Sequence, residues 1–300
     1  MNPGGRAASR TAVLVCQGRA VADGRAAVGR FSDPVALRLL RDGERTTVDE
    51  VRAGTPPQGW QARVAYEGVR ACAEVVVPRT VAIDDALRAR VAGQLVILGA
   101  GLDTRAWRLP ELARTDVWEV DHPASQDDKR ARLTQRGPEE NPRPDADLRA
   151  VARSVRFTPV DFAVADLGAA LDAAGHDPTA TTTWLWEGVV PYLTREQVRA
   201  TVAALATRSA SGSTLIVNYQ APSAKATAGR LLTRLLGSSL TSGEPWLSLW
   251  RPERMAALLA EHDLRVVADD PLLTVAQGLG APVRGRSSLR SGRVAVAERG

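Results

Sequence analysis

The sequence predicts an α/β fold in which helices cover a mainly parallel sheet, and three observations support this prediction. From about residue 95 onward, short β-like runs alternate with longer segments that carry Ala and Leu at helical spacing. The first run ends in Gly99-Ala100-Gly101, a turn expected where a strand leaves such a sheet. Residues 10–92 show helical patterns alone. We therefore expect an amino-terminal helical region, residues 10–92, followed by a core, residues 93–300.

The core is expected to contain seven strands, at residues 95–98, 116–120, 155–157, 182–186, 214–218, 264–267 and 294–297. Its helices are expected at residues 123–135, 167–174, 195–208 and 252–261. The helical region suggests helices at residues 10–28, 34–40, 61–72 and 80–91, with a Gly- and Pro-containing loop at 53–59. Residues 220–250 interrupt the alternation between the fifth and sixth strands. We interpret them as a helical lid insertion, called the insertion below.

Composition excludes several classes of protein. A chain of 300 residues with 44% hydrophobic and 24% charged residues buries a large core and is not intrinsically disordered. Its apolar runs are far shorter than the roughly 20 residues of a membrane span, and its first residues lack a secretory pattern. We therefore expect a cytoplasmic protein with no membrane partner.

Metal and nucleic-acid partners are not expected either. The two cysteines and three histidines are scattered, so neither a disulfide framework nor a zinc site is indicated. The net charge of +5 comes from arginines spread along the whole chain rather than from a basic cluster. Because phosphate binding depends on clustered basic residues, this distribution favours a solvated surface over a nucleic-acid interface. The oligomeric state is left open.

The turn after the first strand indicates a cofactor crevice. Without side chains, Gly99 and Gly101 let the backbone approach a ligand closely at the carboxyl edge of the sheet. The next strand ends in Asp121, a position from which a carboxylate accepts the hydroxyls of an adenosine ribose. In the dinucleotide fingerprint a third glycine follows, whereas this chain has Thr104. Asp103 would repel a pyrophosphate but suits a sulfonium or ammonium, so the loop favours S-adenosylmethionine over NAD.

Four ordered motifs resemble the leucine carboxyl methyltransferase family, in particular its bacterial O-methyltransferase branch. They are Gly-Ala-Gly-Leu-Asp-Thr-Arg at 99–105, Trp-Glu-Val-Asp-His-Pro at 118–123, Val-Asp-Phe at 160–162 and Trp-Glu-Gly-Val-Val-Pro-Tyr-Leu at 186–193. The resemblance extends from about residue 31 to residue 253. It implies a class I methyltransferase fold, Rossmann-like, with strand order 3-2-1-4-5-7-6 and an antiparallel last strand. It also implies S-adenosyl-L-methionine as cofactor.

The resemblance assigns cofactor contacts around the glycine turn. It implies that Gly99, Ala100 and Gly101 line the methionine part of the cofactor and that Asp121 takes the ribose hydroxyls.

Further contacts are implied outside that turn. Asp161 would receive the adenine amino group, although an Asp here also suits a plain turn, and Phe162 would contact the base. Glu187 would lie near the methionine end. Arg79 would pair with the cofactor's carboxylate, for which a planar guanidinium is well shaped. Where relatives often carry another basic residue, this chain has Gln-Gly-Arg at 17–19.

The acceptor is expected to be a small molecule that contacts Tyr192 and, in the insertion, Trp246. An ionised carboxylate requires no general base, which fits a sequence without a recognisable catalytic dyad or triad, so no catalytic residue is assigned. We therefore expect O-methylation of a carboxylate, ahead of a phenol or hydroxyl. A catalytically silent S-adenosylmethionine-binding module is the alternative, and an NAD-dependent oxidoreductase is disfavoured by Asp103 and Thr104.

Overall fold

The computed structural model describes residues 9–134, 148–161, 166–222, 246–280 and 287–300, and it contains one seven-stranded sheet. The strands are β1 (Gln94–Leu98), β2 (Asp116–Asp121), β3 (Ser154–Pro159), β4 (Thr182–Trp186), β5 (Thr214–Gln220), β6 (Leu264–Pro271) and β7 (Gly292–Arg299). Their order is β3-β2-β1-β4-β5-β7-β6, and β7 runs antiparallel to both of its neighbours. All seven expected strands and the expected strand order are confirmed.

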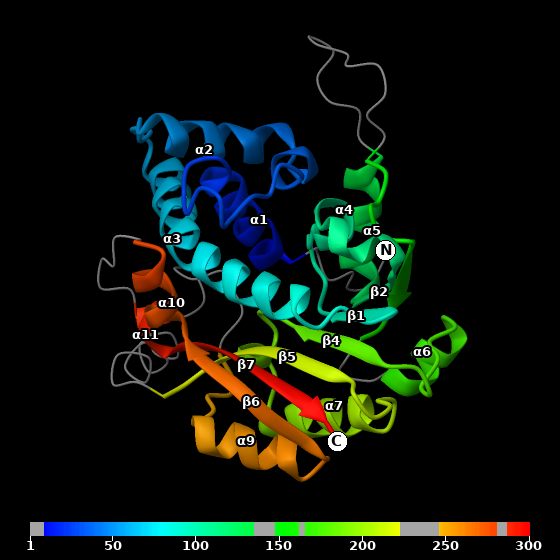
Figure 1. Ribbon diagram of the computed structural model, residues 1–300. Helices are drawn as coiled ribbons and strands as arrows, with labels where there is room; N and C mark the ends of the chain where they lie inside the picture. The colour runs from blue at the N-terminus through cyan, green and yellow to red at the C-terminus, as the bar shows by residue number, and fades with distance from the viewer. Residues whose placement is uncertain (1–8, 135–147, 162–165, 223–245, 281–286) are drawn as a thin grey trace, which may run out of the picture.

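Helices cover both faces of this sheet (Figure 1). Strand β1 shows why, because its side chains alternate between the two sides. Leu95 and Ile97 pack into a core with the amino-terminal helices, whereas Val96 and Leu98 pack into a second core with the helices opposite. Because β1 is apolar on both faces, helices must cover the sheet on both sides of it. The continuous apolar sequence of β1 indicates this arrangement.

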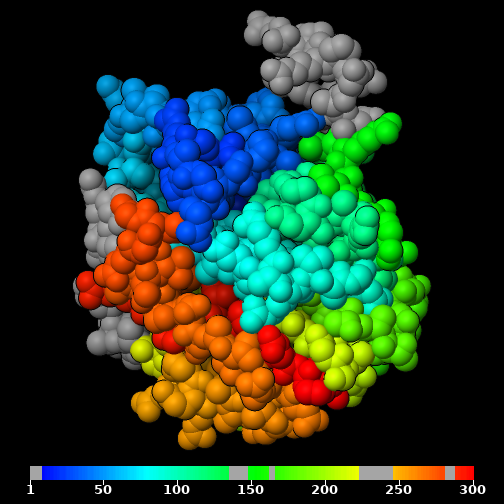
Figure 2. Space-filling model, viewed as in Figure 1, coloured from blue at the N-terminus to red at the C-terminus, as the bar shows by residue number. Residues whose placement is uncertain are grey.

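The helices of the core agree with the sequence expectation in type and place. They are α5 (Pro123–Leu133), α6 (Leu167–Ala173), α7 (Arg195–Ala206) and α9 (Pro252–Ala260). Short elements that the sequence did not indicate are α4 (Arg105–Arg108), η2 (Pro110–Arg114), η3 (Val190–Tyr192), α10 (Leu272–Gly278) and α11 (Ser287–Ser291). Helix α10 packs against the amino-terminal helices, beside which it lies at the surface in Figure 2.

The expectation of two helices at residues 61–72 and 80–91 was wrong, since α3 (Trp60–Arg88) is one continuous helix of 29 residues. Pro78 lies inside it and removes a backbone donor, a change that costs about 3 kcal/mol in an isolated helix. Tertiary packing compensates, because Val77 and Val81 on either side of the proline are buried. At Gly18, helix α1 (Arg10–Ala22) comes so close to α3 that an added Cβ would lie 3.1 Å from the sulfur of Cys72.

The rest of the helical region also departs from expectation. Helix α1 ends at Ala22 rather than at residue 28, and residues 34–40 form only the single turn η1 (Ala36–Leu39). Helix α2 (Asp42–Ala53) was not expected from the sequence, because Val48 is its one buried residue and no apolar stripe marks it. Residues typical of helix ends do mark its limits. Glu44 accepts the N–H of Arg41 at the start, and Gly54 ends the helix in a left-handed conformation.

The strand order predicts a crevice between β1 and β4. Strands β1 and β4 pair up to Leu98 and Trp186. Beyond these residues the chain leads from β1 to β2 on one side and from β4 to β5 on the other, so the two connections diverge. Ligands bind at such a switch point in open α/β sheets. The insertion, residues 220–250, lies mostly outside the described residues: residues 223–245 are not described, and its last five residues lead into α9.

A buried histidine makes the stability of this fold dependent on pH. His176 lies between the rings of Trp118 and Trp184, and its Nε2 contacts the hydroxyl of Thr182 at 3.0 Å. Within the described part of the chain its Nδ1 has no partner. Burial and, secondarily, the charge of Arg208 lower the pKa of His176 to about 4.

We predict that His176 destabilises the protein as the pH falls from about 6.5 toward 4. The unfolded chain, with an ordinary histidine pKa near 6.5, binds more protons in this range, and the loss reaches roughly 3 kcal/mol. His176→Gln removes the titrating group, so its free energy of unfolding should fall less steeply than that of the parent. Chemical denaturation at several pH values measures both slopes, and equal slopes would contradict the prediction.

Candidate functional site

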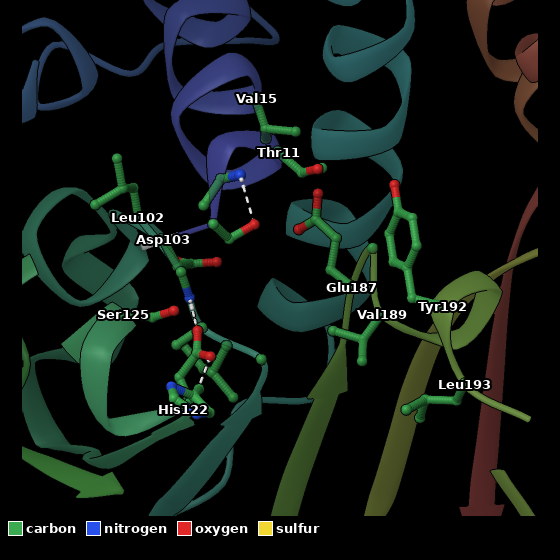
Figure 3. A pocket seen from close by; sticks show the side chains of 18 of the residues that line it. Thr11, Val15, Leu102, Asp103, His122, Ser125, Glu187, Val189, Tyr192 and Leu193 are labelled. Carbon is green, nitrogen blue, oxygen red and sulfur yellow. Dashed lines mark hydrogen bonds between the residues drawn. The ribbon is translucent and has the colours of Figure 1, made fainter. Parts of the chain in front are cut away.

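A pocket of about 570 Å³ opens at the carboxyl ends of β1, β2 and β4. The first turns of α1 pass over it, and Figure 3 shows Thr11 and Val15 above the cavity, with Glu187 and Tyr192 on one side and His122 on the other. The structure brings most of the expected site residues together here: the lining includes Arg79, Gly99, Ala100, Gly101, Asp121, Asp161, Glu187 and Tyr192. Phe162 lies outside the described residues.

The floor of the pocket is the glycine turn after β1. Gly99 has a φ of +67°, and a Cβ on it would lie 2.2 Å from a methyl carbon of Val189. Only glycine suits that position, for conformational and steric reasons together. Gly101 also has a positive φ, +48°, and its N–H donates to Asp121 Oδ2 at 2.5 Å. The turn thereby exposes backbone rather than side chains to a ligand.

Asp121 is held rigidly at the end of β2. One oxygen accepts the N–H of Gly101, and the other accepts the N–H of His122 at 2.6 Å. Burial raises the pKa of Asp121, while these two hydrogen bonds act in the opposite direction. Each carboxylate oxygen has a second lone pair. The geometry therefore suits two hydroxyl donors side by side, as a ribose presents them.

Glu187 and Arg79 meet at the opposite wall. Glu187 follows β4, and one of its oxygens accepts from Nε of Arg79 at 2.6 Å. The other lies 2.8 Å from Nη1 of the buried Arg105. Although burial raises the pKa of Glu187, the charges of Arg105 and Arg79 hold it below its usual range. The wall thus offers a fixed cation beside a fixed anion, which is complementary to the carboxylate and ammonium groups of an amino acid.

Asp103 has an internal partner that the loop sequence did not indicate. Its carboxylate accepts the backbone N–H of Arg105 at 2.7 Å and also pairs with the guanidinium of that residue. Burial raises the pKa of Asp103, but Arg105 and Lys129 together hold it at about 2. Asp103 also lines the pocket, and it shares the guanidinium of Arg105 with Asp84 and Glu187.

The other two walls differ in polarity. His122 and Asp161 lie after β2 and β3, with 4.0 Å between His122 Nε2 and Asp161 Oδ2. On the side of Tyr192, the lining continues with Leu193, Gln197 and Leu247. Trp246, expected to face the acceptor, is half-buried and is not among the lining residues; its neighbour Leu247 is.

None of the expected site residues belongs to α1, although this helix contributes to the lining up to its last turn. Arg19 lines the pocket, pairs with Asp33 at 2.8 Å and donates to the carbonyl of Leu102 at 2.6 Å. The one available signal was the motif at 17–19, where relatives often carry a basic residue. Because Arg19 lies far in sequence from every other lining residue of the sheet edge, spacing could not place it there.

These observations fit an adenosyl cofactor with an amino-acid tail. The pocket has paired acceptors for a ribose, an uncovered backbone turn and a cation-anion pair, and it lies at the switch point of a sheet with strand order 3-2-1-4-5-7-6. This fold and site define a class I methyltransferase.

The comparisons with known proteins identify the family. The sequence profile of the family described as leucine carboxyl methyltransferase matches residues 12–206. A relative from Mycobacterium sp. (strain JLS) is 35% identical over 255 residues, covering 77% of this chain and 75% of the relative. One from Mycobacterium tuberculosis (strain H37Rv) is 36% identical over 217 residues, covering 70% of this chain and 64% of the relative. Both are assigned by name to the S-adenosyl-L-methionine-dependent methyltransferases. The chain belongs to the leucine carboxyl methyltransferase family.

Solved structures agree on the fold. A Thermobifida fusca protein with a methyltransferase name superposes with a TM-score of 0.53 at 17% identity, covering 95% of this chain and 94% of that one. A DUF574 family protein from Streptomyces avermitilis gives a TM-score of 0.54 at 14% identity, with 98% of each chain covered. The fold thus agrees with the family assignment, which rests on the sequence matches and identifies the protein as an S-adenosyl-L-methionine-dependent methyltransferase.

Among the residues that the structure describes, no helix has both the length and the apolar character needed to cross a membrane. The same part of the chain holds no group of three or more His, Cys, Asp or Glu side chains arranged for a metal ion.

We predict that Asp121→Ala weakens binding of S-adenosylhomocysteine by about 2–3 kcal/mol, because a charged acceptor of two hydroxyls is lost. Asp121→Asn keeps one oxygen and should lose less. Calorimetric titration measures both affinities.

Asp116→Ala is the matched control, since it removes a carboxylate from the other end of the same strand, where Asp116 pairs with Arg153. Its affinity for S-adenosylhomocysteine should equal that of the parent. If a folded Asp121→Ala protein also binds like the parent, Asp121 does not hold the ribose.

Proposed function

We propose that this methyltransferase acts on an oxygen atom, and that its acceptor is a carboxylate of a small molecule; a phenol or hydroxyl is the second choice. The observation that carries the proposal is the lowered pKa of Glu187. In the proposed arrangement this carboxylate faces the methionine end of the cofactor, and its ion pairs with Arg105 and Arg79 lower its pKa against the effect of burial. A carboxylate with a lowered pKa is a poor general base at neutral pH. An acceptor that arrives already ionised needs no base.

The residues of the pocket would bind and orient the reactants. When bound, S-adenosylmethionine supplies a methyl group activated by its sulfonium. In the proposed arrangement Asp121 holds the ribose, while Arg79 and Glu187 receive the carboxylate and ammonium of the amino-acid tail. With both ends fixed, the protein contributes mainly proximity and alignment.

The acceptor side supports a small organic molecule. Of the described residues near Tyr192, Leu193, Leu247 and Val189 are apolar, and Gln197 is neutral. A wall of this kind favours an organic body bearing few charges. His122, the imidazole in the lining, lies on the opposite side of the pocket from Tyr192 (Figure 3). It is therefore poorly placed to deprotonate an acceptor there.

We predict that methyl transfer yields an alkali-labile ester and that its rate changes little from about pH 6 to about pH 9, because a carboxylic acid is ionised throughout that range. Labelled S-adenosylmethionine is incubated with benzoate, phenylacetate and hexanoate, and in parallel with phenol and hexanol. Methanol released by mild alkali reports ester, whereas methyl ethers resist this treatment.

Three outcomes separate the alternatives. An alkali-stable product whose formation rises with pH toward the phenol pKa near 10 would identify a phenol acceptor and contradict the carboxylate proposal. Tight binding of S-adenosylhomocysteine without transfer to any probe would favour a silent binding module. Glu187→Gln should weaken cofactor binding yet keep the shape of the pH profile, because Glu187 is not the base.

A further inference from the structure

His122 occupies a junction between two carboxylates of the pocket. It follows Asp121 directly and is the N-cap residue of α5, with Pro123 in the first helical position. Its backbone N–H donates to Asp121 Oδ1 at 2.6 Å, so its main chain already holds the ribose-binding carboxylate. Its side chain lines the pocket, as Figure 3 shows. None of the roles assigned so far uses this ring.

The capping bond defines which ring nitrogen carries the proton. His122 Nδ1 accepts the N–H of Ala124 at 3.2 Å. A nitrogen that accepts a hydrogen bond is unprotonated, so the neutral ring carries its proton on Nε2. The helix cap therefore selects one tautomer and turns a donor away from α5.

That donor faces Asp161. Nε2 lies 4.0 Å from Asp161 Oδ2, and both side chains are about one-third exposed, at 31% and 34%. This separation is longer than a direct hydrogen bond, so contact between the two groups requires a small side-chain movement or one bridging water. The backbones that carry His122 and Asp161 are joined next to this contact, because the N–H of Val160 donates to the carbonyl of Asp121 at 2.8 Å.

We propose that His122 is a positioning residue for the adenine end of the cofactor. Its Nε2–H orients the carboxylate of Asp161 so that this group accepts the exocyclic amino group of adenine. One residue thus positions two acceptors, Asp121 through its main chain and Asp161 through its ring. The proposal rests on the assignment of Asp161 to the adenine. It predicts that His122 contributes to discrimination between adenine and hypoxanthine, which has an oxygen in place of that amino group.

The test distinguishes the effect of the imidazole ring on Asp161 from its effect as the N-cap of α5. In His122→Asn the side-chain oxygen can still cap α5, because Asn is among the best N-cap residues, but the Nε2 donor is lost. His122→Ala loses both functions. Calorimetry measures the affinity of each protein for S-adenosylhomocysteine and for S-inosylhomocysteine, and thermal unfolding without ligand measures the cap.

We expect His122→Asn to unfold at nearly the parent temperature, to bind S-adenosylhomocysteine about tenfold more weakly, and to lose much of the preference for the adenosyl ligand. His122→Ala should show the same binding defect and a lower unfolding temperature. In an Asp161→Asn background, His122→Asn should add little, because the ring acts through that carboxylate.

Parent affinity and parent discrimination in His122→Asn would overturn the proposal, and so would a His122→Ala protein that is less stable yet equally selective. The assignment of Asp161 is tested separately. If Asp161→Asn alone leaves discrimination unchanged, Asp161 does not read the adenine, and the role of His122 falls with it. If His122→Asn and Asp161→Asn weaken binding additively, the ring acts independently of Asp161 and the proposal fails.

Discussion

The buried guanidinium of Arg105 is the interaction on which the rest of the site depends. Its side chain is 2% exposed, and it binds Asp84 of α3, Asp103 of the glycine turn and Glu187 after β4. A buried charge is tolerated only when its partners are close and well oriented. Arg105 therefore requires that the helical region, the turn and the central strand meet in one arrangement, and the pocket forms at that meeting point.

The charges around Arg105 balance one another. Four arginines and four carboxylates form a connected set beneath the pocket: Arg19, Arg79, Arg105 and Arg108 with Asp33, Asp84, Asp103 and Glu187. Every member has an opposite charge nearby. The members that also line the pocket are therefore the ones whose charges a ligand meets directly. Arg79 and Glu187 are such members, and the charges of Arg105 and Arg79 explain how the pKa of a buried glutamate stays below its usual range.

The sequence predicted the sheet better than the helices that cover it. Most of the strands contain a short run rich in apolar or β-branched residues, and that signal is local. The continuity of α3 is not local, since Pro78 argues against a helix and packing against α1 overrides it. In the site, Asp121 and Gly99 were recognisable because they stand at fixed places after strands. The contacts of Arg105 and Arg19 join segments far apart in the chain, and no spacing rule encodes which carboxylate a buried arginine will meet.

The antiparallel β7 has a consequence for the order in which the sheet can assemble. This strand lies between β5 and β6, and β6 pairs with no other strand in the described sheet. During synthesis β6 leaves the ribosome before β7, so it has no edge to join until the later strand has formed against β5. Pairings so distant in sequence are slow to form. Loss of β7 would therefore remove two strands from the sheet, and proteolysis near residue 292 would be more damaging than the length of the lost segment suggests.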